Sequence, residues 1–280
     1  MKKFLAIIAT LVVAVFAFAG CGGSPSASSG SDASASSGSG QKVLKVGASP
    51  VPHAEILEVV KPLLAKEGID LQIVEFSDYV QPNLALNDKE LDANFFQHEP
   101  YLDNFMTEHT DVKLANAGGI HIEPMGIYSK KIKKLDELKD GASIAIPNDP
   151  TNGGRSLLLL EKAGNIKLKE GVGVKATVQD IVENTKNIKF QEVEAAQVPR
   201  TLDDVDAAVI NTNFAMQVNL VPTKDALFME DSTSPFVNIV AVRKGDENRP
   251  EIQALLKALK SDEVKQFIND KYKGAVVPAF

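Results

Sequence analysis

Strand-like and helix-like segments alternate along this chain from residue 43 onward, and this alternation limits its fold more than any other feature. The strand-like segments are short apolar or alternating runs, whereas the helix-like segments carry apolar residues at three- and four-residue spacing. Strands that alternate with helices form parallel-rich sheets that are covered by helices on both faces. We therefore predict an α/β fold with central parallel-rich sheets flanked by helices.

The predicted elements fall into two groups. The predicted strands are 43–48, 71–76, 91–96, 112–117, 143–147, 189–193, 207–210 and 237–242; the predicted helices are 56–64, 79–87, 100–108, 154–163 and two within 250–272. Extended stretches near 120–129 and 235–242 join the groups, so we expect two lobes linked by a hinge. Residues 43–124 plus 236–280 would form lobe 1, and residues 125–235 lobe 2. Because ligands bind beyond the carboxyl ends of parallel strands, we expect a site in the cleft between the lobes.

The first 20 residues have the pattern of a secretory signal peptide. Lys2 and Lys3 precede an apolar run of 16 residues, which is shorter than the ~20 needed to cross a bilayer. Small residues then lead to Cys21, the only cysteine. This arrangement resembles the lipobox of bacterial lipoproteins, with Phe18 where leucine is usual, and it implies that Cys21 is acylated. An ordinary signal peptide with a chance cysteine is the alternative.

Residues 21–42 predict a flexible tether behind this anchor. They are almost entirely serine, glycine and alanine, with no apolar surface to bury, and such a coil spans roughly 25 Å. The folded part that follows is acidic: the formal net charge is −7 overall and −9 without Lys2 and Lys3. Nucleic acids attract clusters of lysine and arginine, so this composition argues against a nucleic-acid partner.

Aromatic residues gather at the ends of two predicted strands. Tyr79 follows one strand, and the segment 92–101 contains Phe95, Phe96, His98 and Tyr101. Neighbouring residues of a strand point to opposite faces, so we expect one phenylalanine in the core and one in the cleft, although both may be core residues. His98 is as consistent with a structural hydrogen bond as with a pocket wall.

Polar residues gather at two further strand ends. In segment 147–155, the backbone amides at a helix start could bind an anion, and two glycines would let it approach. Arg155 would bind a carboxylate through two hydrogen bonds. The alternative is a turn followed by an exposed arginine. Asn211, Thr212 and Asn213 follow the strand at 207–210, and Asn238 lies in the returning strand. Asparagine offers both a donor and an acceptor, which suits a zwitterion, but Asn213 is equally compatible with a turn.

Four segments carry a resemblance to one family. DANFFQHEPYLD, IPNDPTNGGRSLLLL, SPFVNIV and FSDYVQPN resemble the NlpA lipoproteins, the substrate-binding proteins of methionine ABC importers, and the resemblance covers nearly all of 43–280. It implies a hinge-linked, two-lobe periplasmic-binding-protein-like fold (type II), an extracytoplasmic position at the cell membrane, and a permease and ATPase as partners. It also implies an apolar pocket made by Tyr79, Phe96, His98 and Tyr101, and capture of the amino-acid head group by Arg155, Asn213 and Asn238.

Several alternatives stay open on the sequence. The ligand would be L-methionine, and possibly D-methionine, or another apolar amino acid, a short methionine peptide or a methionine derivative. A metal protein would use His53, His98, His121 and Glu99 or Glu123, but no histidines are spaced at i, i+4. An enzyme lacks a recognisable nucleophile motif, and a surface adhesin would have an empty cleft. We expect no cofactor, no metal and no catalytic residue.

Overall fold

The computed structural model describes residues 41–231 and 234–280. The predicted signal peptide and Cys21 lie outside these residues, as does nearly all of the predicted tether. Within the described ranges, no helix is both long and apolar enough to cross a membrane.

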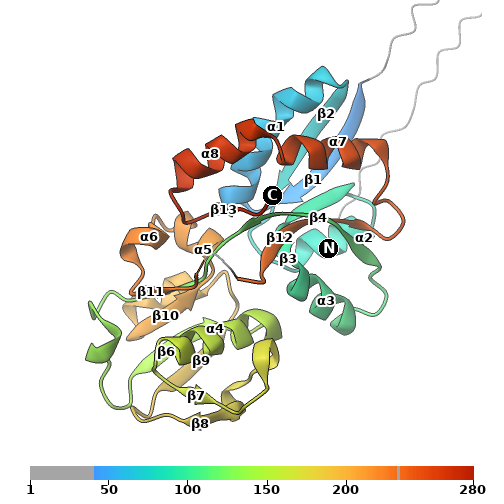
Figure 1. Ribbon diagram of the computed structural model, residues 1–280. Coiled ribbons are helices and arrows are strands. Elements are labelled where there is room, and N and C mark those ends of the chain that lie inside the picture. Colours follow the sequence, from blue (N-terminus) through green and yellow to red (C-terminus); the bar gives the residue numbers. More distant parts are fainter. Residues whose placement is uncertain (1–40, 232–233) are drawn as a thin grey trace, which may run out of the picture. The chain divides into compact units, whose positions relative to one another are not determined.

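The strands form two large sheets and one small one (Figure 1). The first sheet has the order β13 (Val277–Pro278), β4 (Leu114–Ile122), β12 (Val237–Arg243), β3 (Ala93–His98), β1 (Lys42–Ala48) and β2 (Ile69–Glu75). The second has the order β11 (Phe228–Met229), β5 (Gly126–Tyr128), β10 (Ala207–Ile210), β6 (Ser143–Pro147) and β9 (Lys189–Val193). A two-stranded sheet pairs β7 (Lys167–Leu168) with β8 (Ile181–Glu183). We call the first sheet with its helices lobe 1 and the second lobe 2.

Eight α-helices and five short helical turns complete the described part of the chain. The helices are α1 (Glu55–Lys66), α2 (Gln81–Asn87), α3 (Glu99–Glu108), α4 (Pro150–Lys162), α5 (Thr212–Gln217), α6 (Pro222–Asp225), α7 (Pro250–Leu259) and α8 (Asp262–Tyr272). The turns are η1 (Pro50–Ala54), η2 (Leu135–Glu137), η3 (Gly173–Lys175), η4 (Val178–Asp180) and η5 (Val198–Asp203). The expected α/β fold of two lobes is therefore present.

Each large sheet is mixed: three of the five strand pairs in lobe 1 and two of the four in lobe 2 are antiparallel. In lobe 1, β1 pairs in parallel with β2 and β3, whereas β12 runs antiparallel to both β3 and β4. In lobe 2, β6 pairs in parallel with β9 and β10, whereas β5 is antiparallel to β10. β5 and β12, which run antiparallel to both of their neighbours, are the strands that the chain enters from a passage between lobes, without a crossover helix.

Alternating side chains give each sheet two buried faces. In β12, Val240 and Val242 join the core under α1, α7 and α8, while Ile239 and Ala241 join the core under α2 and α3. Figure 1 shows these two groups of helices on opposite sides of lobe 1. Because the residues of a strand alternate between faces, a continuous apolar run such as that of β12 fits only a strand covered on both sides.

Helix α1 is longer than predicted. It continues through Pro62 to Lys66, so proline does not mark its limit. Leu64, beyond the proline, is fully buried on the same face as Ile56 and Val60, and this packing outweighs one missing backbone hydrogen bond. Gly68, at φ 77°, then ends the helix.

The chain passes between the lobes twice. The first passage runs from β4 through Glu123 and Pro124 to β5, and the second from β11 to β12. Two hydrogen bonds tie these passages to their surroundings: the Glu230 carboxylate accepts from the Met125 amide, and the Pro124 carbonyl accepts from the Thr212 hydroxyl. The passages are therefore connected to each other and to α5 at the base of the cleft.

Candidate ligand pocket between the lobes

One pocket collects all seven residues that were predicted to bind a ligand. The space between its lining residues is about 330 Å³, including the part that is open to solvent. The seven are Tyr79, Phe96, His98, Tyr101, Arg155, Asn213 and Asn238. They come from both lobes, so the pocket lies in the cleft that the sequence predicts.

Three aromatic rings form one wall of the pocket. The ring centroid of Tyr79 lies 5.8 Å from that of Phe96 and 5.6 Å from that of Tyr101. The Tyr101 hydroxyl donates to the main-chain oxygen of Tyr79, and the Tyr79 hydroxyl donates to Asn213 Oδ1 at 2.6 Å. Burial raises the pKa of both tyrosines, so both hydroxyls stay protonated. Phe95, the neighbour of Phe96, is fully buried in the core of lobe 1.

His98 has both a structural contact and a place in the wall. Its Nδ1 accepts the backbone N–H of Tyr101 and so caps α3, which requires the proton to lie on Nε2. That Nε2 donates to Asn152 Oδ1 at 3.2 Å, across the cleft to lobe 2. Burial, with a smaller effect from the nearby Arg155 charge, lowers the pKa of His98 to about 3. The imidazole is therefore neutral at physiological pH.

The start of α4 differs from its prediction. The helix begins at Pro150, not at Gly154, and its N-terminal amides are not open to an anion, because the carboxylate of Asp149 accepts from the Asn152 amide at 2.9 Å. Gly154 does not face a ligand: a Cβ there would lie 2.2 Å from the carbonyl oxygen of Val174 in η3. This glycine is required by close packing within lobe 2.

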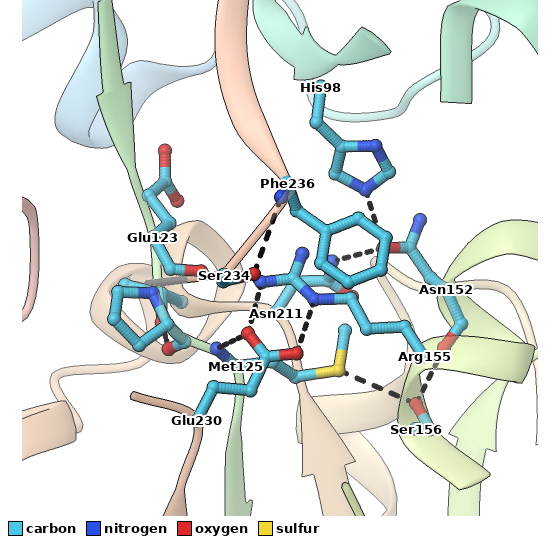
Figure 2. A network of polar contacts seen from close by, with 12 residues as sticks. His98, Glu123, Met125, Asn152, Arg155, Ser156, Asn211, Glu230, Ser234 and Phe236 are labelled. Carbon is cyan, nitrogen blue, oxygen red and sulfur yellow. Dashed lines mark hydrogen bonds and ion pairs between the residues drawn. The ribbon is translucent and has the colours of Figure 1, made fainter. Parts of the chain in front are cut away.

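Arg155 projects from the second turn of α4 to the passages between the lobes (Figure 2). Its Nε and Nη2 donate to the Glu230 carboxylate, with Nε–Oε1 at 2.8 Å, and Nη2 also donates to the main-chain oxygen of Glu123 at 2.8 Å. The guanidinium carbon lies 4.2 Å from the ring centre of Phe236. Among the described residues, Nη1 makes no hydrogen bond, and Arg155 is one of the residues that line the pocket.

Two buried amide atoms in the pocket wall also lack partners in the described structure. They are Asn213 Nδ2, a donor, and Asn211 Oδ1, an acceptor. The other half of each amide is occupied: Asn213 Oδ1 accepts from Tyr79, and Asn211 Nδ2 donates to Asn152 Oδ1. An unpaired buried amide atom is costly, so these two positions favour a ligand that carries both an acceptor and a donor.

Five lining residues were not predicted to bind: Gln97, Glu123, Asn152, Asn211 and Thr212. Four of them stand beside predicted residues in the polar and aromatic clusters, so their position at strand ends was the available signal. Glu123 had appeared only as a possible metal ligand, together with His53 and His121. The structure brings these three together but holds His98 and Glu99 outside that group.

The NlpA lipoprotein family model matches residues 44–280. The D-methionine-binding lipoprotein MetQ of Escherichia coli K12 is 47% identical over 237 residues, which cover 84% of this chain and 87% of that protein. The methionine-binding lipoprotein MetQ of Bacillus subtilis 168 is 47% identical over 243 residues, covering 85% and 89%. A solved structure of a nutrient binding protein from Burkholderia cenocepacia bound to methionine is 50% identical with a TM-score of 0.82, covering 85% of this chain and 100% of that one.

Two α/β lobes, joined by two passages and lining a shared pocket, are the architecture of the two-lobe class of substrate-binding proteins. The match over 237 residues then places the chain within that class. The chain belongs to the NlpA lipoprotein family.

Proposed function

We propose that this protein is an extracytoplasmic substrate-binding lipoprotein that captures methionine in the cleft and delivers it to an ABC importer. The L-isomer is the expected ligand, with the D-isomer also admitted. No catalytic step is involved, in keeping with relatives that are named as binding proteins.

The observation that carries this proposal is the set of unpartnered polar groups in the pocket. Arg155 Nη1, which makes none of the hydrogen bonds of the guanidinium group to the described residues, and Asn213 Nδ2 are donors that suit a carboxylate. Asn211 Oδ1 is an acceptor, which suits an ammonium group. An amino-acid head group satisfies all three at once. A plain carboxylic acid or a plain amine would leave at least one of them unpaired.

The aromatic wall supports an apolar, unbranched side chain. A thioether gains about 0.3–1.5 kcal/mol from each ring contact, and three rings line the wall. A charged side chain would be desolvated there without a partner, because His98 is neutral and both tyrosines stay protonated. The head-group contacts are common to all amino acids, so selection rests on this wall.

The membrane anchor and the transport partners extend the proposal. Acylation of Cys21 and a flexible tether over 21–42 would hold the binding unit at the outer face of the cell membrane. A lipid anchor with two or three chains binds firmly, whereas one chain binds only marginally. The ligand would pass to a permease and ATPase, the partners that the family implies.

The identity of the ligand is tested by denaturing the purified protein and analysing the released small molecules by mass spectrometry. Methionine is expected. Recovery of another apolar amino acid, a methionine peptide or a methionine derivative would change the identity of the ligand but not the function of a substrate-binding protein. A protein that releases nothing, and that gives no heat with methionine in calorimetric titration, would contradict the proposal.

The head-group assignment is tested by two variants in calorimetric titration with methionine. Arg155→Ala removes charge-assisted hydrogen bonds and should weaken binding by about 100-fold or more. Tyr79→Phe removes one hydroxyl and keeps the ring, so the loss should stay below about tenfold. Equal losses in the two variants would count against Arg155 as the carboxylate-binding residue.

A further inference from the structure

A buried cluster of three titratable residues lies behind the pocket. His53 from η1, His121 from β4 and Glu123 from the first passage are 0%, 0% and 6% exposed. Glu123 Oε1 lies 2.7 Å from His121 Nε2 and 3.1 Å from His53 Nε2. His53 Nε2 is also 3.0 Å from Oδ1 of Asn238, which lines the pocket. The cluster is thus continuous with the wall of the ligand site.

The hydrogen bonds fix both imidazoles as donors. His53 Nε2 faces two oxygens, Glu123 Oε1 and Asn238 Oδ1, so it must carry the proton, and His121 Nε2 faces the same carboxylate oxygen. The ring of Phe95 packs edge-on against both imidazoles, at 4.7 Å and 5.2 Å between centroids. Burial lowers the pKa of His53 to about 4 and of His121 to about 3, so both rings are neutral donors that hold the carboxylate in place.

The charges around the pocket leave Glu123 without a full counter-charge. Glu123 and Arg155 are the acid and the base that line the pocket, but Arg155 is already paired with Glu230. The ion-pair contacts of Glu123 in the described structure are the two neutral imidazoles; the Asn213 backbone N–H also donates to its carboxylate, and the Arg155 charge, shared with Glu230, acts on it without direct contact. A buried carboxylate without a cation is unfavourable, so this site favours a ligand that brings a positive charge.

A metal ion is the other kind of cation to which a cluster of two histidines and a glutamate offers ligands. Histidines that ligate a metal almost always donate their second ring N–H to an acceptor. Here Nδ1 of His53 and Nδ1 of His121 are both buried with no partner in the described part of the chain. The geometry therefore favours an organic cation in the pocket over a metal in the cluster.

We propose that Glu123 makes the pocket require an ammonium group in its ligand, and that His53 and His121 are positioning residues that hold its carboxylate. This inference rests on the proposed function, since it takes the ligand to be an amino acid. It assigns the recognition of the two ends of the head group to different elements. Arg155 on α4 binds the carboxylate of the ligand, and Glu123 in the first passage binds its ammonium group.

The test is a comparison of two ligands by calorimetric titration of the full chain. The ligands are L-methionine and 4-(methylthio)butanoate, which lacks only the amino group. In Glu123→Gln, methionine should bind about 10- to 100-fold more weakly, while the deaminated ligand changes less than about threefold. The matched control is Glu230→Gln, which acts on Arg155 and should weaken both ligands by similar factors. His121→Gln should reduce the preference for methionine in the same direction as Glu123→Gln.

The inference is overturned if Glu123→Gln lowers the affinity for both ligands equally, or lowers neither affinity. If Glu123→Gln does not fold by circular dichroism, His121→Gln replaces it with the same criterion. Zn²⁺ binding by the wild type that is lost in these variants would assign the cluster to a metal and overturn the proposal. A wild type that binds neither ligand would overturn the proposed function, and this result is seen before any variant is measured.

Discussion

Mild acid should destabilise this protein because its fold buries three neutral histidines. His53, His98 and His121 are each at most 5% exposed, and burial holds their pKa values at about 4, about 3 and about 3. In the unfolded chain each would protonate near 6.5, the ordinary value. The unfolded state then binds more protons than the folded state, so the free energy of unfolding falls as pH falls below 6.5.

The size of the loss follows from these pKa values. At pH 5.5, one pH unit below the ordinary value, each histidine contributes a loss of about 1.4 kcal/mol, and three contribute about 4 kcal/mol. Burial raises the pKa of Glu123 and Asp149, and proton uptake by these carboxylates in the folded state offsets part of the loss. The expected decrease from pH 7.5 to pH 5.5 therefore lies between about 1.4 and 4 kcal/mol.

Urea unfolding at a series of pH values, followed by circular dichroism, measures this decrease. The variant His98→Asn keeps an acceptor for the α3 cap but removes one titrating group, so its pH dependence should be shallower by about 1.4 kcal/mol at pH 5.5. His109→Asn is the matched control, because His109 stacks on Phe105 at the end of α3, apart from the buried groups. A wild type whose stability is flat between pH 7.5 and pH 5.5 would refute the reasoning.

Three further predictions concern stability and ligand binding. Gly154→Ala should lower the free energy of unfolding by about 1–3 kcal/mol in urea titration, because the new Cβ meets the η3 backbone. Asn83→Ala should cost about 1–3 kcal/mol in the same assay, since it removes three buried hydrogen bonds and leaves Gln97 Oε1 without its donor; an unchanged midpoint would contradict this. Phe236→Ala removes the ring beside Arg155 and should weaken methionine binding about three- to thirtyfold by calorimetry.

Much of the fold follows from local pattern. The strands β6, β9 and β10 have the predicted bounds, because short apolar runs between polar or turn residues specify a strand and both of its ends. Helix α4 shows where local pattern is insufficient. Two adjacent glycines favour a turn, but here they lie inside the helix, where η3 packs too closely for a larger residue.

The residues that line the pocket were predicted more completely than the residues that hold them in place. The lining residues stand at strand ends, and the topology of an α/β fold brings such ends together. The partners of Arg155 are different: Glu230 lies 75 residues away in the chain and reaches Arg155 only through the second passage between lobes. The grouping of His53 with His121 also depends on the packing of η1 against β4, which no periodicity reveals.

The position of β12 determines when the two lobes can form during synthesis. This strand lies between β4 and β3, in the middle of the lobe 1 sheet, yet it is made after the whole of lobe 2. A nascent chain that ends before residue 237 contains a complete lobe 2 sheet but only unjoined parts of the other sheet. As the chain emerges from its N-terminus to its C-terminus, lobe 2 can thus complete its sheet as an inserted unit, whereas the core of lobe 1 closes only when the last 44 residues have followed.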